Sequence, residues 1–122
     1  GGFGFHPMEL ETAAREELPL VVVVAVDAAW GMEKTAFLAQ GYGAADWQHR
    51  GIDLAEVRYD DLARSLGCHG ERVERIEELT PALERALASR RPAVVHVEVD
   101  RELNTKPPGW EQFRKARSVQ GY

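Results

Sequence analysis

Residues 19–32 read P-L-V-V-V-V-A-V-D-A-A-W-G-M, and the fold that we expect follows from this stretch. Its apolar run, residues 20–26, is rich in β-branched valine and predicts a strand buried on both faces of a parallel sheet. Asp27 follows directly, and a carboxylate at the carboxyl end of such a strand lies where open α/β sheets bind ligands. An ordinary turn, in which Asp27 caps the next helix, explains the stretch about equally well.

The other segments predict helices and strands in alternation. Helices are expected over residues 7–17, 31–38 and 59–66, and further strands over residues 69–74 and 93–99. This order favours an α/β fold of three layers, with a mainly parallel sheet, helices on both faces and right-handed crossovers.

One more helix is expected between the last two strands. Thr80 is suited to be its N-cap and Pro81 its first helical residue, because proline lacks only an N–H that needs no partner there. Leu83, Ala86 and Leu87 recur at helical spacing and predict its buried face.

The length of 122 residues suffices for one domain, which we place at residues 1–100, followed by a partly disordered C-terminal tail at residues 101–122. The net charge of −5 argues against a nucleic-acid partner. The apolar run is too short to span a membrane, and no signal peptide is visible. The single cysteine, Cys68, permits no intrachain disulfide, which fits the cytoplasm.

Glycines open the chain ahead of the first expected helix. Gly1, Gly2 and Gly4 could form a loop whose unpaired backbone N–H groups converge on a phosphate. A flexible terminus explains the glycines about as well. His6 follows them and could face a ligand, although a surface position at a helix start is favoured.

Several segments together resemble one known family. They read, in order, G-G-F-G-F-H-P-M-E-L-E-T-A, L-P-L-V-V-V-V-A-V-D-A-A-W-G-M-E-K, V-R-Y-D-D-L-A-R-S-L-G, G-E-R-V-E, E-E-L-T-P-A-L-E-R-A-L-A-S and P-A-V-V-H-V-E-V-D. They resemble the diphosphate-binding domain of thiamine diphosphate enzymes, most of all the large subunit of acetolactate synthase. The likeness runs unbroken from residue 1 to about residue 100.

The resemblance implies a magnesium site. The family carries G-D-G, then a helix, a strand and an Asn-Asn or Asn-Asp pair; the Asp of G-D-G, the second member of the pair and a nearby backbone carbonyl bind Mg²⁺. On this chain Asp27 matches the second member of the pair, Ala29 the carbonyl donor and Gly1 the last glycine of G-D-G. Magnesium prefers such oxygen ligands together with phosphates. Gly1 and Gly2 would offer N–H groups to the diphosphate of the cofactor.

The resemblance also places residues next to the reactive ring of the cofactor. Trp30, Gly31 and Met32 would lie beside the thiazolium, and residues 32–43 would form a mobile lid.

The chain departs from the family pattern at two places. Val26 stands where an asparagine is usual, and the Gly-Asp that should precede Gly1 is absent. We therefore expect a truncated domain whose first strand is missing, with weakened magnesium binding and exposed apolar surface that makes the chain self-associate or only marginally stable.

The function implied by the resemblance is chemistry on 2-keto acids, with thiamine diphosphate as electron sink and a flavin compatible with the parent enzyme. A glutamate on the pyrimidine-binding domain of a second subunit would activate the cofactor, so a homo-oligomer is implied. No catalytic residue is expected in this chain, and we expect no turnover from it alone. Three alternatives stay open: another thiamine diphosphate enzyme (benzoylformate or oxalyl-CoA decarboxylase, or 2-hydroxyacyl-CoA lyase), a non-catalytic remnant that binds a partner, and a flavodoxin-like nucleotide module.

The remaining candidates favour structural roles. His96 and Glu98 share one face of a strand, but two ligands are too few for a metal site. Cys68 and His69 lack the spacing of a zinc site. Trp47 and Trp110 are interpreted as packing residues or subunit contacts.

Overall fold

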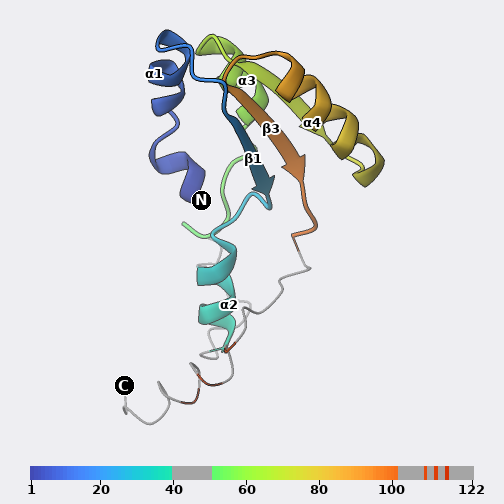
Figure 1. Cartoon of the computed structure of the whole chain (residues 1–122). Coiled ribbons are helices and arrows are strands. Elements are labelled where there is room, and N and C mark those ends of the chain that lie inside the picture. The colour runs from blue at the N-terminus through green and yellow to red at the C-terminus, as the bar shows by residue number, and fades with distance from the viewer. Residues whose placement is uncertain (40–50, 102–108, 110–111, 113–114, 116–122) are drawn as a thin grey trace.

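The computed structural model describes residues 1–39, 51–101, 109, 112 and 115, with side-chain surroundings omitted for residues 36–39 (Figure 1). Its elements are η1 (Gly2–Phe5), α1 (Glu9–Arg15), β1 (Val21–Val26), α2 (Gly31–Ala39), α3 (Tyr59–Ser65), β2 (His69–Val73), η2 (Ile76–Glu78), α4 (Leu79–Ala88) and β3 (Ala93–Glu98). None of the helices in this described part is long and apolar enough to cross a bilayer.

The three strands form a parallel sheet in the order β1-β3-β2. Val21 of β1 and His69 of β2 both lie beside Ala93 of β3, so β3 is the central strand. Successive side chains of β3 point to opposite faces of the sheet. Val94 packs in one cluster with residues of α1 and α3, and Val95 packs in another with residues of α4. Helices therefore cover both faces of a parallel sheet, as the alternating pattern predicted (Figure 1).

The strand that is buried on both faces is β3, and not β1 as predicted. β1 forms an edge of the described sheet, and Val23 in its middle is 52% exposed, whereas residues 93–96 are almost fully buried. The prediction for residues 20–26 was wrong because α4 packs mainly over β2 and β3, which leaves one face of β1 open. An apolar run cannot by itself distinguish a central strand from an edge strand.

The first helix is shorter than predicted. Residues 2–5 form the 3₁₀ turn η1 rather than an open loop, and α1 begins at Glu9, two residues after Pro7. Glu17, with a φ of 52°, adopts a left-handed conformation and follows the end of the helix. The predicted stripe is confirmed, since Leu10 and Ala13 are both 5% exposed.

α4 corrects two further predictions. Thr80 is not the N-cap: the helix begins at Leu79, directly after η2, so Pro81 is its third residue. Proline is tolerated there because N–H groups of a first turn have no partner within the helix. Leu87 is 66% exposed, and the buried face consists of Ala82 and Ala86 with Leu83 half-buried.

The other elements agree with the sequence. α3 ends where predicted, and Gly67 follows it with a φ of 82°, a conformation that favours glycine. β2 and β3 lie within the predicted ranges, and α2 begins at Gly31 as expected. The predictions for residues 40–43 of the lid, for Trp47 and Trp110, and for most of the tail concern residues outside the described part.

Candidate functional site

Asp27 begins a tight turn at the carboxyl end of β1. Ala28 has a φ of 48°, which reverses the chain, and the N–H of Ala29 donates a hydrogen bond of 3.1 Å to Oδ1 of Asp27. Asp27 thus orders its own turn rather than capping α2, which begins four residues later at Gly31.

Two distant segments hold this turn, which we call the Asp27 turn (residues 27–29). Residues 52–54 pair with it on one side: the N–H of Trp30 donates to the carbonyl of Ile52, and the N–H of Leu54 to that of Ala28, both at 2.8 Å. Arg101 donates to the carbonyls of Asp27 and Ala28. These partners could not be predicted from local sequence patterns, because they lie 22 or more positions away along the chain.

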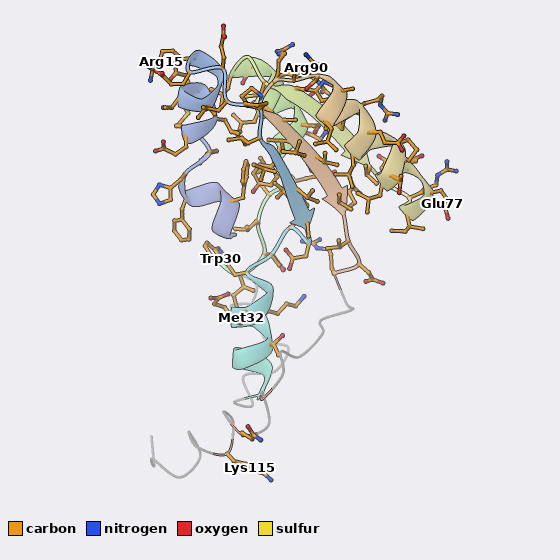
Figure 2. All side chains as sticks on the ribbon, viewed as in Figure 1. Arg15, Trp30, Met32, Glu77, Arg90 and Lys115 are labelled. Atoms are coloured by element: carbon orange, nitrogen blue, oxygen red, sulfur yellow. The ribbon has the colours of Figure 1, made fainter. Side chains whose placement is uncertain are left out.

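A shallow pocket lies at this edge of the sheet. Gly1 and Phe3 of the N-terminal turn and the Asp27 turn form its walls. The described residues that line it are Gly1, Phe3, Val24, Ala25, Val26, Asp27, Ala28, Ala29, Leu54, Ala55, Val57 and Tyr59. The pocket therefore joins the N-terminus, the end of β1 and the segment before α3, three parts that are far apart in sequence. Figure 2 shows Trp30 at this same edge, just before α2.

Trp30 packs tightly on the N-terminal turn. A Cβ atom on Gly1 would lie 2.6 Å from the indole ring, so the close approach requires glycine. The ring of Phe5 lies 5.4 Å from that of Trp30, measured between centroids. This packing holds Gly1 against the turn that carries the carboxylate.

The structure brings together four of the predicted site residues, Gly1, Asp27, Ala29 and Trp30. Met32 instead is 65% exposed and lies on α2 beyond the end of the sheet (Figure 2). No described atom comes within 4 Å of a Cβ placed on Gly2. Gly31 forms the first residue of α2. That these seven residues bind a cofactor stays a prediction.

Asp27 supplies a single carboxylate to the pocket. Within the described residues, no group of three or more histidine, cysteine, aspartate or glutamate side chains could hold a metal ion, and the Asp27 carboxylate has no cationic partner, since Arg101 bonds the backbone carbonyl instead. Such an unpaired carboxylate, beside backbone carbonyls and the start of a helical turn, suits an ion that takes most of its ligands from phosphate and water. It does not suit zinc, which needs several protein ligands.

A buried charge network supports the pocket from α3. The Asp60 carboxylate is inaccessible to solvent and accepts hydrogen bonds from Arg58 Nε (2.9 Å), Arg58 NH2 (2.7 Å) and Arg64 NH1 (3.1 Å). The bonds from Arg58 are the main cause that lowers the pKa of Asp60 to about 2. Next to Asp60, Tyr59 lines the pocket and donates its N–H to Nδ1 of His96.

His96 and Glu98, the two residues of β3 that were considered as a metal pair, have unlike surroundings. His96 is 1% exposed, and burial lowers its pKa, which favours the neutral ring that the N–H of Tyr59 requires. Glu98 is exposed and bonds Arg72.

The other histidines and the cysteine also have structural surroundings. His6 is exposed, as expected, and its ring lies 6.4 Å from that of Phe5, measured between centroids, at a tilt of 42°. Cys68 is buried and its thiol donates to the carbonyl of Leu10, while His69 pairs with Glu71 on β2. Neither forms a zinc site among the described residues.

Comparison with known proteins identifies the class. Residues 1–97 match the family "Thiamine pyrophosphate enzyme, C-terminal TPP binding domain", and the chain belongs to this family. The predicted resemblance is thus confirmed.

Two relatives illustrate the likeness. The chain is 44% identical over 101 residues to the acetolactate synthase large subunit IlvG of Mycobacterium tuberculosis, covering 82% of this chain and 18% of that protein. It is 35% identical over 122 residues to the putative thiamine pyrophosphate-containing protein YdaP of Bacillus subtilis, covering 100% of this chain and 20% of that protein. The chain therefore spans about a fifth of the length of these curated relatives.

The fold recurs in solved structures. Benzoylformate decarboxylase from Polynucleobacter necessarius superposes with a TM-score of 0.72 at 22% identity, over 85% of this chain and 19% of that one. At this identity the match shows a shared fold.

Proposed function

We propose that this chain is the diphosphate- and magnesium-binding part of a thiamine diphosphate-dependent enzyme that acts on 2-keto acids, in the manner of acetolactate synthase. The observation that carries the proposal is the Asp27 carboxylate, unpaired by any described cation, in a pocket that also contains Gly1. The 44% identity to an acetolactate synthase large subunit supports the choice of reaction.

The residues present fit a magnesium–diphosphate group. The carboxylate of Asp27 and the carbonyl of Ala29 would hold Mg²⁺, with phosphate oxygens as further ligands. Gly1 and Gly2 would hold the diphosphate through N–H groups at the start of η1, where the first amides have no partner within the turn. When bound, thiamine diphosphate supplies an electron sink for the carbon that loses carbon dioxide.

This chain's own contribution is binding and enclosure rather than proton transfer. Trp30, Gly31 and Met32 would close one side of the site beside the thiazolium. Activation of the cofactor would come from the pyrimidine-binding domain of a second subunit, so the working form is proposed to be a cytoplasmic homo-oligomer.

Calorimetric titration of thiamine diphosphate with Mg²⁺ tests the proposal. Three chains are compared: the chain as it is, a version extended by Gly-Asp before Gly1, and the extended version with Asp27→Ala. Glu33→Gln in the extended version is the matched control, because Glu33 is an exposed carboxylate in the first turn of the nearby α2. We expect binding in the extended chain and its Glu33→Gln variant, and none after Asp27→Ala.

Two results would overturn the proposal. Binding that ignores both Mg²⁺ and Asp27 would favour a nucleotide module. No binding in any version, even after addition of the partner domains of a relative, would favour a non-catalytic remnant.

A second candidate function keeps the cofactor and changes the reaction. The alternative to a synthase is a decarboxylase, such as the benzoylformate decarboxylase whose fold this chain shares. Product analysis with pyruvate and benzoylformate, on a chimaera that carries this chain within a relative, distinguishes carboligation from simple decarboxylation.

A further inference from the structure

Arg101 contacts the Asp27 turn from the far end of the chain. Its Nε donates to the carbonyl oxygen of Asp27 and its NH2 to that of Ala28, each at 2.9 Å. The donors belong to one planar guanidinium group, and the acceptors are consecutive carbonyls, so the contact is bidentate. The bonds span 74 and 73 positions of sequence.

The backbone of the turn explains why one guanidinium reaches both carbonyls. In an extended strand, successive carbonyl groups point to opposite sides. Ala28 has a φ of 48°, and this left-handed residue turns the two carbonyls towards the same donor. Such a conformation is costly for alanine and persists where its surroundings hold it.

Strand register explains why Arg101 is the residue that reaches the turn. Val26 lies beside Glu98 in the parallel ladder, and the N–H of Val99 donates to the carbonyl of Val26. Both strands therefore end together at the pocket edge, and Arg101 follows β3 as the Asp27 turn follows β1.

We propose that Arg101 is a positioning residue that fixes the Asp27 turn and thereby aims the Asp27 carboxylate for the metal–diphosphate site; the ligand part of this inference rests on the proposed function. Arg101 donates only to backbone carbonyl oxygens, so it does not occupy the Asp27 carboxylate, which remains available to a ligand in the pocket. Without it, the left-handed turn keeps the bonds to residues 52–54 and the bond from Ala29 to Asp27, but loses its only described charged donor.

Amide hydrogen exchange on the 122-residue chain tests the positioning role without any ligand. Arg101→Ala is expected to speed exchange at the N–H groups of Ala29, Trp30 and Leu54 by about tenfold, because a charge-assisted contact to the turn is removed. Arg101→Lys keeps the charge but not the planar fork, and we expect most of the same increase.

Arg91→Ala is the matched control. Arg91 is also exposed and donates to a backbone carbonyl, that of Gly67, but it precedes β3 and lies at the opposite end of the sheet. The three amides should exchange in this variant as in the unchanged chain. Exchange within about twofold of the unchanged chain in Arg101→Ala would overturn the proposal.

Magnesium titration tests the link to the site. In the chain extended by Gly-Asp, with thiamine diphosphate present, Arg101→Ala should weaken Mg²⁺ binding by about tenfold, and Arg91→Ala should not. Binding that needs Asp27 but is unchanged by Arg101→Ala would overturn this inference and leave the proposed function intact. If the extended chain binds no cofactor even with the partner domains of a relative added, the proposed function fails, and amide exchange alone decides whether Arg101 fixes the turn.

Discussion

Asp60 carries a charge in the interior at little apparent cost, because its partners are arranged around it. Its carboxylate is inaccessible to solvent, yet Arg58 and Arg64 together donate three hydrogen bonds to it. Both arginines remain partly exposed, so only one member of the network loses its hydration completely. Because only one charge is fully desolvated, the desolvation penalty is smaller than in an ion pair with both members buried, where it often exceeds the electrostatic gain.

The pKa of Asp60 predicts how stability depends on pH. The folded value of about 2 lies below the ordinary 3.8, so the ionised form stabilises the fold. This stabilisation is complete above about pH 5 and is lost as the pH falls through 4 towards 2. We expect Asp60→Asn to lower the free energy of unfolding at pH 7 by about 1 to 2 kcal/mol, allowing for screening of its half-exposed partners. The free energy of unfolding of this variant should also fall less steeply between about pH 5 and pH 2.5.

Urea denaturation between pH 2.5 and pH 7 measures this effect. Asp61→Asn is the control, since Asp61 also contacts Arg58 and Arg64 but its side chain is 57% exposed. A loss at pH 7 as large for Asp61→Asn as for Asp60→Asn would contradict the argument.

Gly1 allows a second prediction at the level of single residues. Its Cα faces the Trp30 ring so closely that a methyl group would have to displace the indole. Gly1→Ala should therefore shift the indole N–H resonance of Trp30 and weaken cofactor binding. Gly2→Ala should leave that resonance in place, because nothing lies within 4 Å of the added methyl group. An unmoved resonance in Gly1→Ala would show that the aromatic packing tolerates a side chain.

Between elements, β2 approaches α3 closely at Gly70. A Cβ atom there would lie 2.2 Å from the backbone oxygen of Asp60, and backbone cannot move aside as a side chain can. Gly70→Ala should lower the free energy of unfolding by about 2 to 3 kcal/mol through forced separation of strand and helix. Thermal unfolding measures this loss. Gly4→Ala is the control and should be nearly neutral, because the nearest atom to the added methyl group is the Tyr59 hydroxyl at 4.0 Å.

The elements also show what can and cannot be read from sequence. Alternating apolar segments correctly predicted a parallel α/β sheet, because β-branched runs and amphipathic stripes are local properties. Burial, by contrast, depends on the position of a strand in the sheet. Val23 and Val95 lie in similar valine runs, yet Val23 is 52% exposed in the edge strand β1 and Val95 is fully buried in the central strand β3. The start of α4 was misplaced because a 3₁₀ turn leads directly into it, and its N-cap residue, Glu78, makes no side-chain capping hydrogen bond.

In the site, too, local features could be predicted from the sequence and contacts between distant segments could not. Asp27 was predictable because a lone carboxylate follows an apolar strand, a pattern contained in adjacent residues. Arg101 was not, because its role depends on the register of β1 against β3. Strand register, had it been known, is the signal that would have placed Arg101 at the same edge.

At the scale of the whole molecule, the distribution of titratable groups predicts the limits of activity. Among the described residues, the pocket lining contains one carboxylate, Asp27, and no histidine, lysine or glutamate. With Mg²⁺, thiamine diphosphate and pyruvate, we expect no carbon dioxide release above the background of the cofactor alone. A coupled assay for carbon dioxide checks this, and release that disappears with Asp27→Ala would contradict it.

The open side of β1 predicts self-association. No strand of the described part pairs with its outer edge, and Val23 is 52% exposed beside Leu20, which is 36% exposed. An unpaired edge next to exposed aliphatic side chains is a template for pairing with another chain. We therefore expect the apparent mass in analytical ultracentrifugation to rise with protein concentration.

Val23→Lys distinguishes this edge from other apolar surface. A lysine on the exposed face places a charge at the edge without disturbing the core, so association should weaken while the free energy of unfolding changes by less than about 0.5 kcal/mol. Val24→Ala, at a position 8% exposed in the cluster beneath α1 and α3, should do the reverse and cost about 2 kcal/mol without reducing association. A monomer at every concentration, or association that ignores Val23→Lys, would mean that β1 is not the contact, because only at this strand do an unpaired backbone edge and an exposed valine coincide in the described sheet.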